Sequence, residues 1–236
     1  MVDHHNCQPR IRAICFDLDG VLIHTMPLHA QAWQQALQRR GLRVSKREIY
    51  AWEGEPGVVT ARRVLSRKTP HPADSAIADV LADKERILSQ LAHRVPVHRE
   101  LSSLIQRLSR GEIRLALVTG TSWQEVLRIV PAALLRRFHA VITGDRVRRG
   151  KPDPEPYRRA IRACRVRPHA TAVVENAPYG IRSARAAGAG MVIAWTTSLP
   201  RRYLSEADLV VTSARTLVGT IERLTCIDKR ARRRLQ

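Results

Sequence analysis

The chain has 236 residues, 44% of them apolar, which is enough for a substantial core in one domain or in a domain with an insertion. No apolar run reaches the roughly eighteen residues of a membrane span, and residues 1–10 lack a hydrophobic signal core, so we expect a cytoplasmic protein without membrane contact. The net charge of +20 attracts phosphate polyanions, but the basic residues are spread along the chain and not interleaved with aromatic ones, which makes nucleic acid a less expected partner.

The first predicted element is a buried strand over residues 13–16, because a short apolar run before a turn signal is typical of a strand covered on both faces. Asp17 and Asp19 follow it, and Gly20 lets the chain turn. Ligands of open α/β sheets bind at this end of the strands. One carboxylate is already ionised for nucleophilic attack, and the second has the chemistry to transfer a proton. A strand that ends in a solvated Asp-Gly turn is the alternative.

The next stretch of the chain has helical apolar spacing and predicts a small helical unit. Its expected helices cover residues 27–41, 58–65 and 73–93. On the first of them, His29 and Trp33 lie one turn apart and face inward. His29 is either a substrate contact or a packed helix histidine, and Trp33 is expected in the core. Residues 24–26 and 94–97 are expected to pair as a hinge.

After the hinge, strands and helices alternate, which implies a parallel, doubly wound sheet with right-handed crossovers. The predicted strands cover residues 113–118, 140–143, 171–174, 191–194 and 208–211. The predicted helices cover residues 99–109, 123–130, 155–164, 178–188 and 216–224. We therefore expect an α/β fold whose Rossmann-like core consists of residues 1–24 and 97–236, with residues 25–96 as an inserted helical domain.

The chain ends in a basic run at residues 229–234, which is typical of a solvated tail. Its four cysteines form no Cys-x-x-Cys pair, which favours reduced thiols and argues against a zinc site. We expect a monomer or a weak dimer.

A polar group follows each of three further predicted strands: Thr119, then Lys151, then the pair Glu175 and Asn176. Because the carboxyl ends of parallel strands share one edge of a sheet, these groups are expected to converge with the two aspartates. Taken singly, Lys151 is equally a surface lysine in a Pro-rich loop, and Asn176 is equally a cap of the helix that begins near Pro178.

Together these motifs resemble the haloacid dehalogenase superfamily, whose signature is Asp-x-Asp-Gly, a Ser or Thr after a strand, a Lys and a terminal acidic pair. The chain is most similar to the β-phosphoglucomutase-like branch, over nearly its whole length apart from the first ten residues and the basic tail. The motifs that carry this resemblance are FDLDGVL (residues 16–22), VTGTS (118–122), GKPDP (150–154) and ENAPYGI (175–181).

The resemblance implies a Rossmann-like haloacid dehalogenase core with an inserted helical cap that selects the substrate. It implies that Asp17 becomes an aspartyl phosphate, and that Asp19 protonates the leaving oxygen and then activates water. Thr119 would hold a phosphoryl oxygen, and Lys151 would neutralise charge during phosphoryl transfer. The implied substrate-binding residues are Gly120, Thr121 and His29.

The resemblance also implies Mg²⁺, a hard cation that takes oxygen ligands. Its ligands would be the Asp17 carboxylate, the Asp19 backbone carbonyl, and Glu175 or Asn176. The branch usually carries an aspartate where this chain has Asn176. Either Glu175 supplies the missing charge, or the affinity for the metal falls.

The loop of the expected cap, residues 52–57, reads WEGEPG and is acidic, whereas a sugar-phosphate mutase needs an arginine there to hold a second phosphate. We therefore expect a magnesium-dependent phosphohydrolase of a small phosphorylated metabolite, of the sugar phosphate or phosphoglycolate type. Two alternatives stay open: a β-phosphoglucomutase-type mutase, and a basic nucleic-acid-binding protein with a degenerate site. Lys84, Arg62 and Arg63 are candidates for binding a second anionic group or belong to a solvated helix face.

Overall fold

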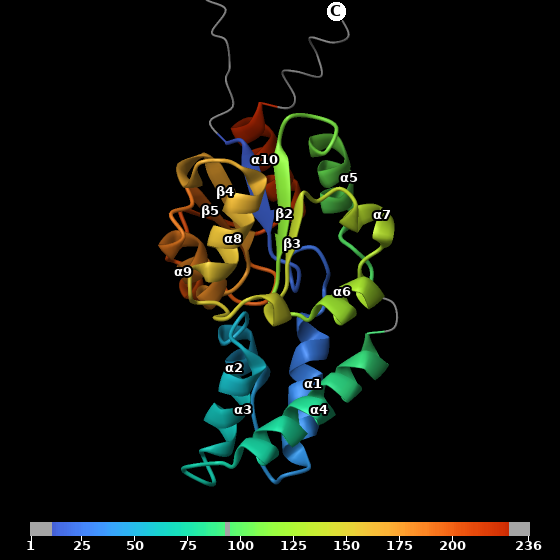
Figure 1. Ribbon diagram of the computed structural model, residues 1–236, viewed down its shortest axis with the longest axis vertical. Coiled ribbons are helices and arrows are strands. Elements are labelled where there is room, and N and C mark those ends of the chain that lie inside the picture. Colours follow the sequence, from blue (N-terminus) through green and yellow to red (C-terminus); the bar gives the residue numbers. More distant parts are fainter. Residues whose placement is uncertain (1–10, 93–94, 227–236) are drawn as a thin grey trace, which may run out of the picture.

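The computed structural model describes residues 11–92 and 95–226. Its centre is a parallel sheet of six strands in the order β3-β2-β1-β4-β5-β6 (Figure 1). The strands are β1 (Ala13–Phe16), β2 (Arg114–Val118), β3 (Ala140–Ile142), β4 (Thr171–Glu175), β5 (Met191–Trp195) and β6 (Leu209–Val211). The chain builds outward from β1 in one direction and then in the other, so the crevice between the two halves opens at the carboxyl end of β1.

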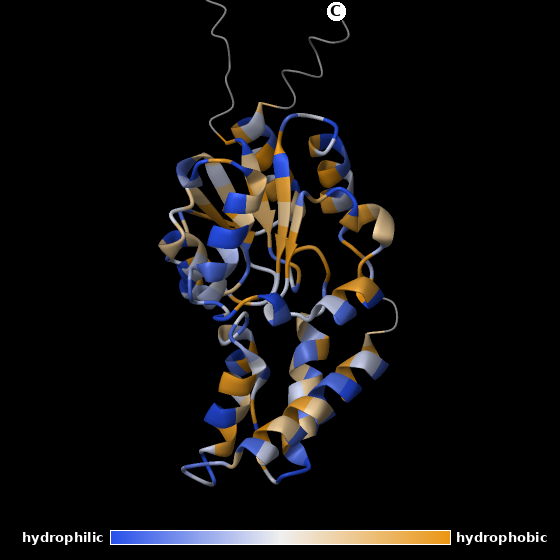
Figure 2. Cartoon of the chain, in the orientation of Figure 1, coloured by the Kyte–Doolittle hydropathy of each residue, from blue (hydrophilic) through white to orange (hydrophobic). Residues whose placement is uncertain are grey.

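Helices cover both faces of the sheet, which confirms the predicted doubly wound α/β fold. The helices of this part are α5 (Arg99–Leu108), α6 (Trp123–Ile129), α7 (Ala132–Leu135), α8 (Glu155–Cys164), α9 (Pro178–Ala186) and α10 (Ala214–Thr225). Alternate residues of β1 point to opposite faces. Ile14 and Phe16 pack with α5 and α10, whereas Ala13 and Cys15 pack with α8 and α9. Figure 2 shows the apolar strands between helices with hydrophilic outer faces.

The inserted unit is built from α1 (Met26–Gln38), α2 (Lys46–Ala51), α3 (Gly57–Leu65) and α4 (Asp74–Leu91), and it lies beyond the carboxyl ends of the strands (Figure 1). Trp33 belongs to its core, as expected, and is packed there with Leu37, Ile77 and Val80. The sequence interpretation missed α2, because Ile49 is its one buried residue and leaves no apolar stripe. The feature of the sequence that could have indicated α2 is the capping box that starts at Ser45.

The ends of the predicted elements agree with the structure to within three residues, and the short helix α7 was also missed. The predicted hinge strand at residues 24–26 is wrong, because α1 already begins at Met26 and the pairing with Val97 is made by Ile23. Arg94 and the basic run lie outside the described residues. The domain boundaries at residues 24/25 and 96/97 stay a prediction.

Cys15 and Cys164 are buried free thiols, but Cys226 is disulfide-bonded, so the expectation of reduced cysteines throughout is wrong.

Over residues 11–92 and 95–226, none of the helices combines the length and the apolar character needed to cross a membrane.

Candidate active site

A buried lysine joins two carboxylates at the carboxyl edge of the sheet. Lys151 Nζ lies 2.6 Å from Asp17 Oδ1 and 2.6 Å from Glu175 Oε1, and it donates a third hydrogen bond to the Val118 carbonyl at 3.2 Å. The side chain is 3% exposed, so the alternative of a surface lysine is wrong. Burial alone would lower the pKa of Lys151, but Asp17 and Glu175 raise it above the usual range, and the ammonium stays charged.

Asp17 stands at the end of β1, and its backbone N–H donates to the Val174 carbonyl of β4. Burial raises the pKa of its carboxyl group well above the ordinary value, with smaller contributions in the same direction from Glu175 and Asp19. Lys151 opposes this shift. The charge of Asp17 in the folded protein therefore depends on the cations placed beside it.

Asp19 is held by four side chains. Thr25 Oγ1 donates to Oδ1 at 2.5 Å, and His29 Nε2 lies 3.1 Å from the same oxygen. Thr121 Oγ1 and Thr119 Oγ1 donate to Oδ2 at 2.7 Å and 3.1 Å. The solvated Asp-Gly turn is therefore wrong for this chain, because both aspartates are buried.

The pKa shifts of Asp19 and His29 determine which of the two holds their shared proton. Burial would raise the pKa of Asp19, but His29 and the hydroxyl groups of Thr25 and Thr121 lower it below the ordinary value. Burial would lower the pKa of His29, but Asp19 raises it. The proton of the pair therefore resides on the imidazole, one hydrogen bond away from Asp19, and His29 belongs to the site instead of being a packed helix histidine.

The loop after β2 contributes more than Thr119. The Thr119 hydroxyl accepts a hydrogen bond from the backbone N–H of Thr121 at 3.0 Å, which fixes the loop beside Asp19. A Cβ on Gly120 would lie 3.8 Å from the Gly54 carbonyl oxygen, so this loop meets the loop of the inserted unit.

Glu175 orients Lys151 and is itself occupied by hydrogen bonds. Its Oε1 accepts from Lys151 and from Tyr157 Oη at 2.6 Å, and its Oε2 accepts from the Asn176 backbone N–H at 3.0 Å. Sequence reasoning missed Tyr157, which sits in the apolar stripe of α8 and reads as a core residue. Only the need of a buried hydroxyl for a partner could have indicated it.

Two buried oxygens fit a metal ion. Asp17 Oδ2 and Asn176 Oδ1 have no hydrogen-bond partner among the described residues, and leaving such a group unpaired costs about 1–3 kcal/mol. Asn176 Nδ2 donates to Ser198 Oγ at 3.4 Å. No side chain caps α9, whose N-cap is Ala177, so the capping role for Asn176 is wrong.

Gly20 makes room for the asparagine. Its φ is +84°, and a Cβ there would lie 2.1 Å from Asn176 Nδ2. The described residues contain no cluster of three His, Cys, Asp or Glu side chains suited to a metal. The donors that fit are instead one carboxylate oxygen and one amide oxygen, Asp17 Oδ2 and Asn176 Oδ1, which are the hard oxygen ligands that Mg²⁺ accepts.

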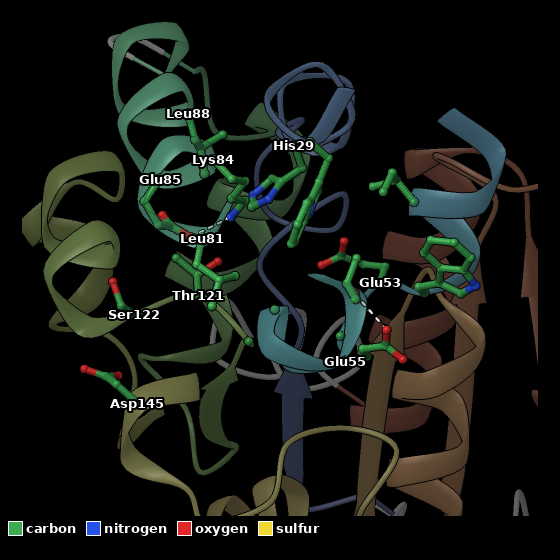
Figure 3. A pocket seen from close by; sticks show the side chains of 17 residues that line it. His29, Glu53, Glu55, Leu81, Lys84, Glu85, Leu88, Thr121, Ser122 and Asp145 are labelled. Atoms are coloured by element: carbon green, nitrogen blue, oxygen red, sulfur yellow. Dashed lines mark hydrogen bonds and ion pairs between the residues drawn. The ribbon is translucent and has the colours of Figure 1, made fainter. Parts of the chain in front are cut away.

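A cavity of about 170 Å³ lies between the inserted unit and the sheet edge (Figure 3). Its lining combines the loop of residues 52–57, the inner faces of α1 and α4, and the loop after β2. His29 and Thr121, both predicted site residues, face this space. The predicted residues Asp17, Asp19, Thr119, Lys151, Glu175 and Asn176 form the buried cluster beside it.

Comparison with known proteins agrees with this geometry. Haloacid dehalogenase-like hydrolases match the chain over residues 11–188. Validoxylamine A 7'-phosphate phosphatase of Streptomyces hygroscopicus subsp. limoneus is 30% identical over 83% of this chain and 91% of its own. Hexitol phosphatase A of Escherichia coli (strain K12) is 29% identical over 89% of this chain and 95% of its own. The solved structure of a putative beta-phosphoglucomutase from Bacteroides vulgatus superposes with a TM-score of 0.81 and 27% identity, over 92% of this chain and 90% of that one.

Proposed function

Because the chain belongs to the haloacid dehalogenase-like hydrolase family, we propose that it is a magnesium-dependent phosphatase of a small phosphorylated sugar or related metabolite. The observation that carries this proposal is the buried contact of 2.6 Å between Lys151 and Asp17, with the Asp19 cluster beside it. The relatives named as phosphatases support hydrolysis as the reaction.

In the proposed reaction, Asp17 Oδ1 attacks phosphorus, and the bond to the ester oxygen breaks. The leaving oxygen takes a proton from the pair of Asp19 and His29 and departs as an alcohol. A water molecule then gives its proton to Asp19 and attacks the aspartyl phosphate, which releases inorganic phosphate and restores Asp17. Lys151 holds its charge throughout and stabilises the negative charge that develops on the transferred group.

Membership of the family implies a divalent metal ion, for which we propose Mg²⁺. Asp17 Oδ2, Asn176 Oδ1 and the Asp19 backbone carbonyl would hold it. When bound, the ion supplies positive charge to the phosphoryl oxygens. Glu175 is not proposed as a ligand, because its oxygens already accept three hydrogen bonds.

The proposal is tested by phosphate release from a panel of sugar and polyol monophosphates with Mg²⁺. We expect hydrolysis of at least one ester, and a fall in its rate by more than about 100-fold on chelation with EDTA, because EDTA removes the ion that stabilises charge on the phosphoryl oxygens. Addition of excess Mg²⁺ should restore it. Conversion of β-glucose 1-phosphate to an isomer without phosphate release would instead favour a mutase, and steep salt-dependent retention of DNA or RNA without any hydrolysis would favour a nucleic-acid binder.

Replacing Asn176 with aspartate should lower the Mg²⁺ concentration for half-maximal activity by about tenfold, because a charged oxygen replaces a neutral one at the proposed site. The measurement is a Mg²⁺ titration of the initial rate at saturating substrate. Asp153→Asn, in the loop after Lys151, is the control for an altered carboxylate outside the ligand set. An unchanged or higher half-maximal concentration in the Asn176→Asp variant would contradict ligation by this residue.

A further inference from the structure

The cavity between the inserted unit and the sheet edge is acidic, in a chain whose net charge is +20. Of the described residues that line it, four carry carboxylates, one is a lysine, and one is His29, which holds the proton of its pair with Asp19. The carboxylates are Glu53, Glu55, Glu85 and Asp145, and the lysine is Lys84. The sign of the charge in the cavity is therefore a local property, opposite to that of the molecule as a whole.

Two of these carboxylates, Glu55 and Glu85, are already paired with cations. Glu55 Oε2 accepts from Arg63 Nη2 at 2.8 Å, and Glu55 Oε1 accepts from the Thr60 hydroxyl at 2.7 Å. Glu85 pairs with Lys84 at 2.7 Å. These pairs neutralise one another and leave little net charge for a ligand to meet.

Asp145 Oδ1 accepts from the Thr143 hydroxyl at 2.6 Å and from the Trp123 backbone N–H at 3.1 Å. The Glu53 side chain, by contrast, has no hydrogen-bond or ion-pair partner among the described residues. Figure 3 shows its carboxylate directed into the cavity, on the same side as His29. Glu53 is thus an unpaired acceptor that faces the cavity.

The loop that carries Glu53 is fixed against the catalytic groups. Gly54 has a φ of +86°, and a Cβ there would lie 2.9 Å from Cδ of Lys151, so only glycine allows this approach without displacement. The same residue lies against Gly120. Glu53 is therefore held at a set distance from the phosphate-binding groups, on the side where the remainder of the substrate must extend.

We propose that Glu53 selects substrates whose part remote from the phosphate carries hydroxyl groups, and that it rejects substrates with a second phosphate or a carboxylate. This inference rests on the proposed phosphatase function and names the substrate class as monophosphates of neutral polyols. A hydroxyl group donates to the free carboxylate, whereas a second anion meets an unpaired like charge in a partly enclosed space.

The experiment compares kcat/KM for sorbitol 6-phosphate, phosphoglycolate and fructose 1,6-bisphosphate, with the full chain and Mg²⁺. We expect the wild type to prefer sorbitol 6-phosphate over each anionic substrate by at least about tenfold. Glu53→Lys should lower this preference by at least about tenfold, and Glu53→Gln should lower it severalfold. The control is Glu100→Lys, an exposed residue of α5 with the same charge change, which should leave the ratios unaltered.

The pH dependence of the ratio gives a second readout. Burial raises the pKa of Glu53 to about 7, opposed by His29, Lys84 and Lys151, while Asp19 adds to the rise. Glu53 is thus neutral below this pH and charged above it. The preference for sorbitol 6-phosphate over phosphoglycolate should increase from pH 6 to pH 8 in the wild type and stay level in Glu53→Gln. Ionisation of the substrate phosphates affects the wild type and Glu53→Gln alike, so the difference between the two pH profiles isolates the contribution of Glu53.

Ratios unchanged in both Glu53 variants, or a wild type that prefers phosphoglycolate or the bisphosphate, would overturn the role of Glu53. The phosphatase function would survive that result as long as hydrolysis still depends on Asp17. Absence of hydrolysis of every ester by the wild type would instead overturn the proposed function, and the role of Glu53 with it.

Discussion

Replacing Asp17 with asparagine is expected to lower the rate of phosphate release from every substrate by at least about 10⁴-fold, a loss of the size seen when a covalent nucleophile is removed. The amide has nearly the same shape as the carboxylate but cannot attack phosphorus. Lys151 keeps its contact with Glu175 in this variant. Since one of two buried carboxylates is removed and the lysine stays paired, thermal unfolding should occur close to the wild-type temperature.

The matched control is Asp79→Asn, which changes an exposed aspartate of α4 and should leave the rate unaltered. Mass spectrometry of acid-quenched wild-type enzyme should find phosphate on the peptide that contains Asp17. Full activity in the Asp17→Asn variant would rule out an aspartyl phosphate on Asp17, although the chain would then still be a phosphatase. Such a result would not affect the fold assignment. It would indicate that water attacks phosphorus directly.

Much of the fold could be predicted because buried parallel strands leave a strong pattern in the sequence. Residues 13–16 and 115–118 are continuous apolar runs, and this pattern follows directly from burial on both faces. Helix α2 left no comparable pattern, since a helix of six residues with one buried side chain depends on its cap more than on its apolar stripe.

Six of the polar residues of the buried cluster could be predicted from the sequence, because each of them lies at or just beyond the end of a predicted strand or in the loop that follows it. The partners of those groups could not, because they come from distant parts of the chain. Tyr157 reaches Glu175 only through the packing of α8 on the sheet. Glu53 meets the cavity only because Gly54 lies against Lys151. The acidity of residues 52–57 could be predicted from the sequence, but neither contact has a local pattern there, so the shape of the cavity and the position of Glu53 in it had to come from the structure.

Replacing Lys151 with methionine is expected to lower the rate by at least about 10³-fold, the upper range for the loss of one group that stabilises charge in a transition state. It should also destabilise the fold, because breaking a buried ion pair from one side costs about 3–5 kcal/mol. Lys151 is the partner of both Asp17 and Glu175, so its loss leaves two buried carboxylates without their cation. The control is Lys46→Met, an exposed lysine of α2.

The destabilisation of the Lys151→Met variant should depend on pH in a defined direction. Burial already raises the pKa of Asp17 above its ordinary value, and Lys151 opposes this rise, so loss of the ammonium raises the pKa of Asp17 in the folded state further. The folded state then binds more protons, so stability falls as pH rises. Urea unfolding in EDTA should therefore show a larger difference from the wild type at pH 8 than at pH 5.5. A difference that is constant with pH, or larger at pH 5.5, would mean that Lys151 does not hold two ionised carboxylates together in the folded protein.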